Sequence, residues 1–305
     1  MRHALGPAKM AARRRPPPRL LQLASLVAST HALCSSAGAG AGGAQTSLYR
    51  PFLDSALAIF SEQGVALREY PVDKGLQSQS AETGPAARRE RVELNVNAYC
   101  TEEIRQARLA LIEGGSALQV LNFCIFPHLS YGLPTFAADL VTLPGGHLIA
   151  LDWAPNGGPA DELAYARDGA LARCFERHRA ELPDGGPLPE AAQRYFSPYF
   201  LWSRLPAGSE GDETVASTVR RAFDDYLRTY LQLVADATPL EGDAERADVR
   251  AAQVSYTRYR AESDPARPML TRLYGEEFAE RLIHEVLFDL ERWMSEGAGE
   301  SDVTR

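Results

Sequence analysis

The sequence predicts an α/β fold in which a central antiparallel β-sheet is covered by helices. Short apolar segments joined by brief turns dominate the first half of the chain, whereas helical periodicity dominates from residue 160 onward. Short connections imply antiparallel neighbours. Strands followed mainly by helices favour one sheet that is covered by those helices. The 305 residues, 45% of them hydrophobic, can bury one substantial core.

Two helices are predicted in the first half of the chain. Ser47 can cap the first, in which apolar residues from Leu48 to Phe60 recur at helical spacing. The second is predicted from Thr101, where two glutamates suit a first helical turn, to the glycine pair at 114–115.

Strands account for the other apolar segments of this half. The last three form a meander, and Gly145 with Gly146 supplies the turn between its final two strands. Predicted extended segments are 64–70, 91–99, 117–126, 135–143 and 147–153, with a polar loop at 75–90. Predicted helices of the second half are 160–180, 189–195, 212–236, 243–261 and 275–294, with a loop at 182–190.

The first 45 residues are expected to be a removable presequence rather than part of the fold. They hold six of the 32 basic residues and none of the 40 acidic ones. A basic run precedes an apolar stretch at 20–33, which matches a secretory-type signal and is short for a membrane span. We therefore expect a domain at 46–296 and a disordered tail at 297–305, with no membrane span in the mature protein.

Charge and motif content exclude several function classes. Without the presequence, 26 basic residues face 40 acidic ones, and a net charge of −14 argues against nucleic acid as a partner. The scattered cysteines form no C-x-x-C pair, so no metal or iron–sulfur site is implied. Neither G-x-G-x-x-G nor the P-loop pattern occurs, so a nucleotide lacks its usual binding loop. An oxidoreductase with this sequence needs an external source of electrons.

Asp139 is the first candidate catalytic residue. It lies among alanine, leucine and valine in the predicted strand 135–143, with few ion-pair partners nearby in sequence. Burial favours the neutral acid, which suits a proton donor. Alternatively, Asp139 faces solvent on a one-sided sheet or binds backbone amides in a neighbouring loop.

Two blocks of sequence resemble the ferredoxin-dependent bilin reductases. The pattern FP…Y-x-LP-x-F-x-x-D-x-V is matched by Phe126, Pro127, Tyr131, Leu133, Pro134, Phe136, Asp139 and Val141. The segment 259–290 is similar to the family's carboxy-terminal block, and 47–60 resembles its opening helix. The resemblance implies a three-layer α/β/α sandwich, with a linear tetrapyrrole (bilin) between the sheet and the carboxy-terminal helices. It also implies electrons from reduced ferredoxin and no bound cofactor.

The resemblance also implies the residues of the site. Asp139 and Asp264 correspond to the two proton donors, because a bilin accepts single electrons and the acids decide which carbon is protonated. Asp264 could instead cap a helix that begins at Pro265. Asn122 stands where the phycocyanobilin-forming branch has a histidine, and an amide cannot relay a proton. The expected substrate contacts are Asn122, Phe126, Phe136 and Arg267.

Three functions remain open at this stage. The segments VLNF and ADLVTLPGGHLIALD are most similar to the branch that reduces the A-ring diene of 15,16-dihydrobiliverdin to phycoerythrobilin. A sister reductase would make 15,16-dihydrobiliverdin or phytochromobilin from biliverdin, and a non-catalytic carrier would only bind bilins. Expected partners are ferredoxin, the bilin and, transiently, the preceding bilin reductase. With its presequence, the chain is expected in the plastid.

Overall fold

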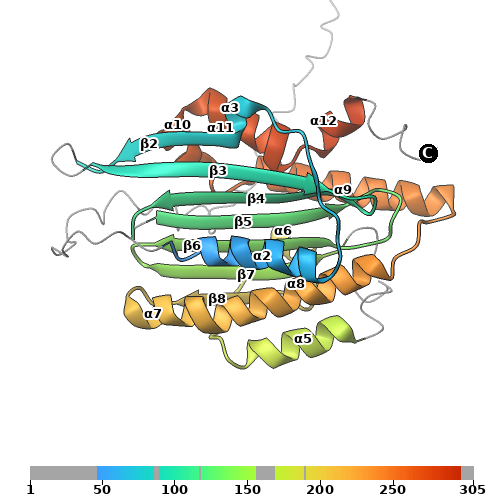
Figure 1. Ribbon diagram of the computed structural model, residues 1–305, viewed down its shortest axis with the longest axis horizontal. Coiled ribbons are helices and arrows are strands. Elements are labelled where there is room, and N and C mark those ends of the chain that lie inside the picture. The colour runs from blue at the N-terminus through green and yellow to red at the C-terminus, as the bar shows by residue number, and fades with distance from the viewer. Residues whose placement is uncertain (1–46, 86–88, 117, 156–168, 189, 297–305) are drawn as a thin grey trace, which may run out of the picture.

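The computed structural model describes residues 47–85, 89–116, 118–155, 169–188 and 190–296 (Figure 1). The predicted presequence, the tail and residues 160–168 of a predicted helix lie outside these ranges. Within them, no helix combines the length and apolar character needed to cross a bilayer.

One antiparallel sheet forms the centre of the molecule, with the strand order β1-β3-β4-β5-β6-β7-β8, and β2 also pairs with β3. The strands are β1 (Arg68–Glu69), β2 (Ser78–Thr83), β3 (Glu90–Cys100), β4 (Ile104–Gly114), β5 (Leu118–Pro127), β6 (Thr135–Leu143), β7 (Gly146–Ala154) and β8 (Leu201–Leu205). The predicted turn joins β6 to β7. Gly146 has a φ of 130°, and a Cβ there would lie 2.2 Å from the Leu205 carbonyl oxygen, so this position requires glycine.

Helices precede the sheet and follow most of it along the chain. They are α2 (Arg50–Glu62), α3 (Lys74–Gln77), α5 (Ala170–Arg179), α6 (Glu190–Gln193), α7 (Ser209–Thr214), α8 (Arg220–Ala235), α9 (Asp243–Glu262), α10 (Arg267–Tyr274), α11 (Glu276–Leu282) and α12 (Leu290–Ser295). A π-helical turn, Val215–Val219, joins α7 to α8, and another, Ile283–Leu287, follows α11.

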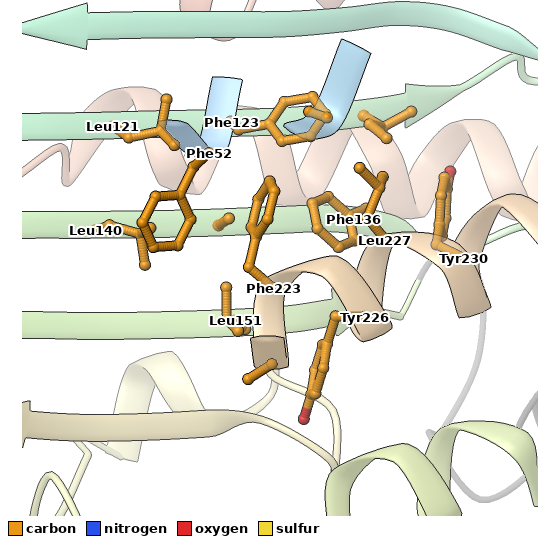
Figure 2. Close-up of a cluster of buried hydrophobic side chains, with 14 of the residues drawn as sticks. Phe52, Leu121, Phe123, Phe136, Leu140, Leu151, Phe223, Tyr226, Leu227 and Tyr230 are labelled. Atoms are coloured by element: carbon orange, nitrogen blue, oxygen red, sulfur yellow. The ribbon is translucent and has the colours of Figure 1, made fainter. Parts of the chain in front are cut away.

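The first face of the sheet carries an aromatic core. Alternate side chains of β5, β6 and β7 point toward α2 and α8, which lie across this face in Figure 1. Figure 2 shows Phe123 and Phe136 of the sheet meeting Phe52 of α2 and Phe223 of α8. Phe136 packs edge-on against Phe123 with ring centroids 5.4 Å apart, a favourable aromatic geometry.

The second face carries a separate core against α3 and the carboxy-terminal helices α9, α10 and α11. Its sheet residues are smaller, and include Cys124 of β5 and Ala137 of β6. Helices on both faces confirm the predicted three-layer α/β/α architecture with a central antiparallel sheet.

The predicted helix at 101–114 is wrong, because this segment is strand β4. Its side chains are buried on both faces, so the apolar residues run almost continuously instead of alternating. Thr101 makes the preceding turn, and its hydroxyl accepts hydrogen bonds from the Glu103 and Ile104 amides. The polar loop predicted at 75–90 contains α3 and β2, while β8 and α10 were not predicted. The three meander strands and the helices at 212–236 and 243–261 agree with the structure to within a few residues.

Candidate active site

Asp139 lies on the second face of the sheet, in the middle of β6. It pairs in register with Asn122 of β5, and the Asn122 amide donates a hydrogen bond to Asp139 Oδ1. This carboxylate is less buried than its apolar neighbours in sequence indicated, and its ion-pair partner lies far away along the chain. The Asp139 side chain is 30% exposed and forms an ion pair.

Arg260 supplies the partner of Asp139. Its guanidinium, on α9, donates a hydrogen bond of 2.9 Å to Asp139 Oδ2. One helical turn earlier, Tyr256 lies under the same guanidinium, and Phe288 packs against it from the carboxy-terminal segment. Sequence proximity does not identify Arg260 as the partner, because 121 residues separate it from Asp139.

Asp264 approaches from the loop between α9 and α10. Its Oδ1 accepts a hydrogen bond of 2.8 Å from the Ala266 amide. Burial raises the pKa of Asp264, while this hydrogen bond and the positive charge of Arg260 act in the opposite direction. Helix α10 begins later, at Arg267, so Asp264 stabilises a turn rather than capping the helix as considered from sequence. This hydrogen bond uses Oδ1, and the second carboxyl oxygen of Asp264 takes no part in it.

Asp152 is a third carboxyl on this face that sequence reasoning missed. It lies on β7 opposite Ala137, diagonal to Asp139 on the neighbouring strand. The Ser197 hydroxyl donates to Asp152 Oδ1 at 2.5 Å and the Ser197 amide to Oδ2 at 3.1 Å. Burial, only partly offset by these hydrogen bonds, raises the pKa of Asp152 to about 7. Asp152 lies two residues after Ala150, which pairs with Asp139, so its side chain is on the same face of the sheet as Asp139. This spacing could have identified Asp152 from the sequence.

The expected substrate contacts divide between the two faces. Phe126 lies fully buried on the Asp139 face, under the guanidinium of Arg105. Phe136 belongs to the aromatic core on the opposite face, so its predicted contact with a substrate beside Asp139 is wrong (Figure 2). Arg267 forms an ion pair with Glu280 and donates to the Ala261 carbonyl oxygen, so its guanidinium fastens the end of α9.

A second buried ion pair holds the carboxy-terminal helices on this face. Arg105 of β4 and Asp289, next to α12, are 2.8 Å apart, and both side chains are almost fully buried. The Tyr70 hydroxyl donates to Asp289 at 2.5 Å, and Gln106 donates to the same carboxylate at 3.2 Å. These bonds tie the segment around Asp289 to the sheet, while Arg105 Nε and Nη2 have no hydrogen-bond partner among the described residues.

The arrangement can deliver protons from two directions. Asp139 rises from the sheet and Asp264 comes from the helical layer, with the cation of Arg260 near both. Carboxyl groups held in this way suit general acid catalysis. The described residues contain no group of three or more His, Cys, Asp or Glu side chains placed to hold a metal ion.

The raised pKa of Asp152 predicts a pH dependence of stability. Between about pH 4, the ordinary carboxyl range, and pH 7, the folded protein keeps a proton that the unfolded chain has released. This stabilisation is complete below about pH 4 and is lost as the pH rises through 7, by up to about 1.4 kcal/mol per pH unit. Asp152→Asn should remove this part of the dependence in urea unfolding at pH 5 and 8. Asp54→Asn, at an exposed position of α2, is the control. An unchanged pH dependence in Asp152→Asn would contradict the assignment.

Known proteins with similar sequences extend over most of this chain. The family described as ferredoxin-dependent bilin reductase matches residues 55–289. A phycoerythrobilin:ferredoxin oxidoreductase of Parasynechococcus marenigrum is 48% identical over 244 residues, which cover 80% of this chain and 92% of that protein. One of Nostoc punctiforme is 45% identical over 247 residues, which cover 80% and 94%.

A solved structure agrees with the fold. Phytochromobilin synthase from tomato, in complex with biliverdin, matches with a TM-score of 0.70 at 27% identity, covering 80% of this chain and 84% of that one. The shared sandwich and the family match over residues 55–289 show that the chain belongs to the ferredoxin-dependent bilin reductases.

Proposed function

We propose that this reductase converts 15,16-dihydrobiliverdin to phycoerythrobilin by reducing its A-ring diene with electrons from ferredoxin. The observation that carries the proposal is the pair of carboxyls, Asp139 and Asp264, that approach from the sheet and from the helices beside Arg260. Relatives named phycoerythrobilin:ferredoxin oxidoreductase, 43–48% identical to this chain, support the choice of product.

The chemistry divides between the electron donor and the protein. Ferredoxin supplies single electrons, and the conjugated bilin holds each one until a proton arrives. Two electrons and two protons convert the diene to the reduced A-ring. We assign one proton to Asp139 and the other to Asp264, because placement of the acids determines which carbon is protonated.

The residue beside Asp139 limits the regiochemistry. Asn122 donates to Asp139 and cannot itself titrate, so these two residues cannot share a proton as a histidine and an aspartate can. Only the carboxyl can deliver a proton from this pair. This supports a single protonation site near Asp139, as reduction at one ring requires.

Two other functions are weighed against this proposal. A sister reductase acting on biliverdin is favoured by the similarity to the tomato structure, which contains that pigment. A carrier without catalysis would need neither Asp139 nor Asp264 beside the pigment, since burying carboxyl groups is costly.

The function is tested with two substrates under anaerobic conditions. Purified protein is mixed with reduced ferredoxin and either 15,16-dihydrobiliverdin or biliverdin, and products are separated by chromatography and identified by absorbance. We expect phycoerythrobilin from 15,16-dihydrobiliverdin and little change to biliverdin. Efficient conversion of biliverdin alone would assign the chain to a sister branch, and binding of both pigments without conversion would support the carrier.

Removing either acid should block turnover after the pigment has bound. Asp139→Asn and Asp264→Asn preserve shape and remove the transferable proton, so each should bind pigment but lose at least about 100-fold in turnover. Electron delivery should leave a persistent bilin radical in electron paramagnetic resonance spectra. Asp54→Asn provides the matched surface control. If Asp264→Asn turned over at a rate near that of wild type, the role of Asp264 would be limited to its turn contact with Ala266.

We further propose that residues 1–45 direct the chain to the plastid through a secretory-type first step. The support is their acid-free composition and the apolar stretch behind a basic run. A fluorescent protein fused to residues 1–45 should accumulate in plastids of a photosynthetic cell. The same fusion with the apolar stretch 20–33 replaced by serine should remain in the cytosol. Cytosolic fluorescence from the unaltered fusion would overturn the proposal.

A further inference from the structure

Arg108 is a fully buried cation next to the site without a carboxylate partner. It lies on β4, and its strand neighbour across β5 is Cys124. Among the described residues no Asp or Glu lies within ion-pair distance of its guanidinium, and Nε and Nη2 have no nitrogen or oxygen partner. A buried charge in such surroundings is costly.

Arg108 donates a short hydrogen bond to the side chain of Asn122 and also lies in hydrogen-bonding contact with the Cys124 thiol. Its Nη1 donates to Asn122 Oδ1 at 2.5 Å and to the Asn122 carbonyl oxygen at 3.4 Å. A guanidinium has donors only, so the amide oxygen must face Arg108 and the amide nitrogen must face Asp139. Arg108 thereby decides which end of Asn122 meets the catalytic carboxyl.

In this orientation, both carboxyl oxygens of Asp139 face hydrogen-bond donors. Asn122 donates to Oδ1 and Arg260 donates to Oδ2, and neither can accept a proton. If the amide turned over, its oxygen would accept a hydrogen bond from protonated Asp139. That contact would stabilise the protonated acid and hold back its proton.

We propose that Arg108 is a positioning residue, which locks the Asn122 amide so that a proton on Asp139 has no acceptor in these contacts and passes to the substrate. The inference rests on the proposed function, in which Asp139 protonates the bilin. Arg108 of β4 then acts on catalysis through Asn122 and does not contact the reacting atoms.

The charged and titratable groups around Asp139 come from each element packed against it. They are Arg108 of β4, Cys124 of β5, Asp152 of β7, Tyr256 and Arg260 of α9, and Asp264 of the following loop. Replacing Arg108 by an uncharged side chain of similar length leaves the chemical identity of all the other groups unchanged. A change in pH dependence therefore reports on the link between Arg108 and Asn122, or on the charge of Arg108 itself.

Arg108→Met removes the donor and the charge, and Arg108→Lys keeps both. For Arg108→Met we expect a fall in kcat of about 10-fold with a KM changed less than threefold. We also expect the alkaline limb of the kcat profile to move up by about one pH unit. Arg108→Lys should recover at least half of the lost turnover. A buried methionine in place of an uncompensated charge is compatible with folding, which thermal unfolding and pigment absorbance will check.

A double-variant cycle separates positioning from a direct charge effect. In an Asn122→Leu background, Arg108→Met should cause no further loss, because the amide that Arg108 orients is gone. Independent, multiplicative losses, or an unmoved pH profile in Arg108→Met, would overturn the proposal. Asn122→Leu alone should also shift the alkaline limb upward, which keeps the test available if Arg108→Met does not fold. Asp139→Asn is assayed in parallel. If Asp139→Asn retains turnover, the proposed function fails. If Asp139→Asn is inactive and Arg108→Met is normal, the positioning role alone fails.

Discussion

Burial of the sheet on both faces is the constraint on which the other features of this structure depend. A polar side chain under a layer of helices loses water and must find a partner. The first face is built mainly of aromatic and aliphatic side chains, and its buried Thr142 hydrogen-bonds to Tyr49 and His147. The second face concentrates its polar groups near the centre, where Asn122 and Asp139 bind each other and Arg260 reaches them from α9. The position of α9 over the sheet and the geometry of the site are therefore set by the same contacts.

The two faces also differ in side-chain volume, and this difference has a functional consequence. Close packing of Phe123, Phe136 and Phe223 fills the first layer and makes that face rigid. Small residues, such as Ala137 and Ala150, flank Asp139 on the other face. Ala150 and Asp139 are partly exposed there, so the sheet can carry a ligand on this face while the first face holds it in shape.

Local patterns could be predicted from the sequence, whereas contacts between residues far apart in the chain could not. The meander was predicted because its turns are short, whereas β4 was misread because burial on both faces removes the alternation that marks a strand. Asp139 was found through its motif, but its partner Arg260 comes from a distant helix. Phe136 was misassigned although its position three residues before Asp139 was sufficient: an odd separation along a strand places two side chains on opposite faces.

Charge balance explains why the acids of this site differ in their access to protons. Two guanidinium groups, Arg108 and Arg260, face three carboxyls, Asp139, Asp152 and Asp264. These positive charges favour ionised carboxylates, whereas burial favours the neutral, protonated form of a carboxyl. Burial assigns that form most readily to Asp152, which is 2% exposed, whereas the Asp139 side chain is 30% exposed. Solvent therefore reaches the Asp139 side chain more readily than that of Asp152, and burial favours retention of the Asp152 proton.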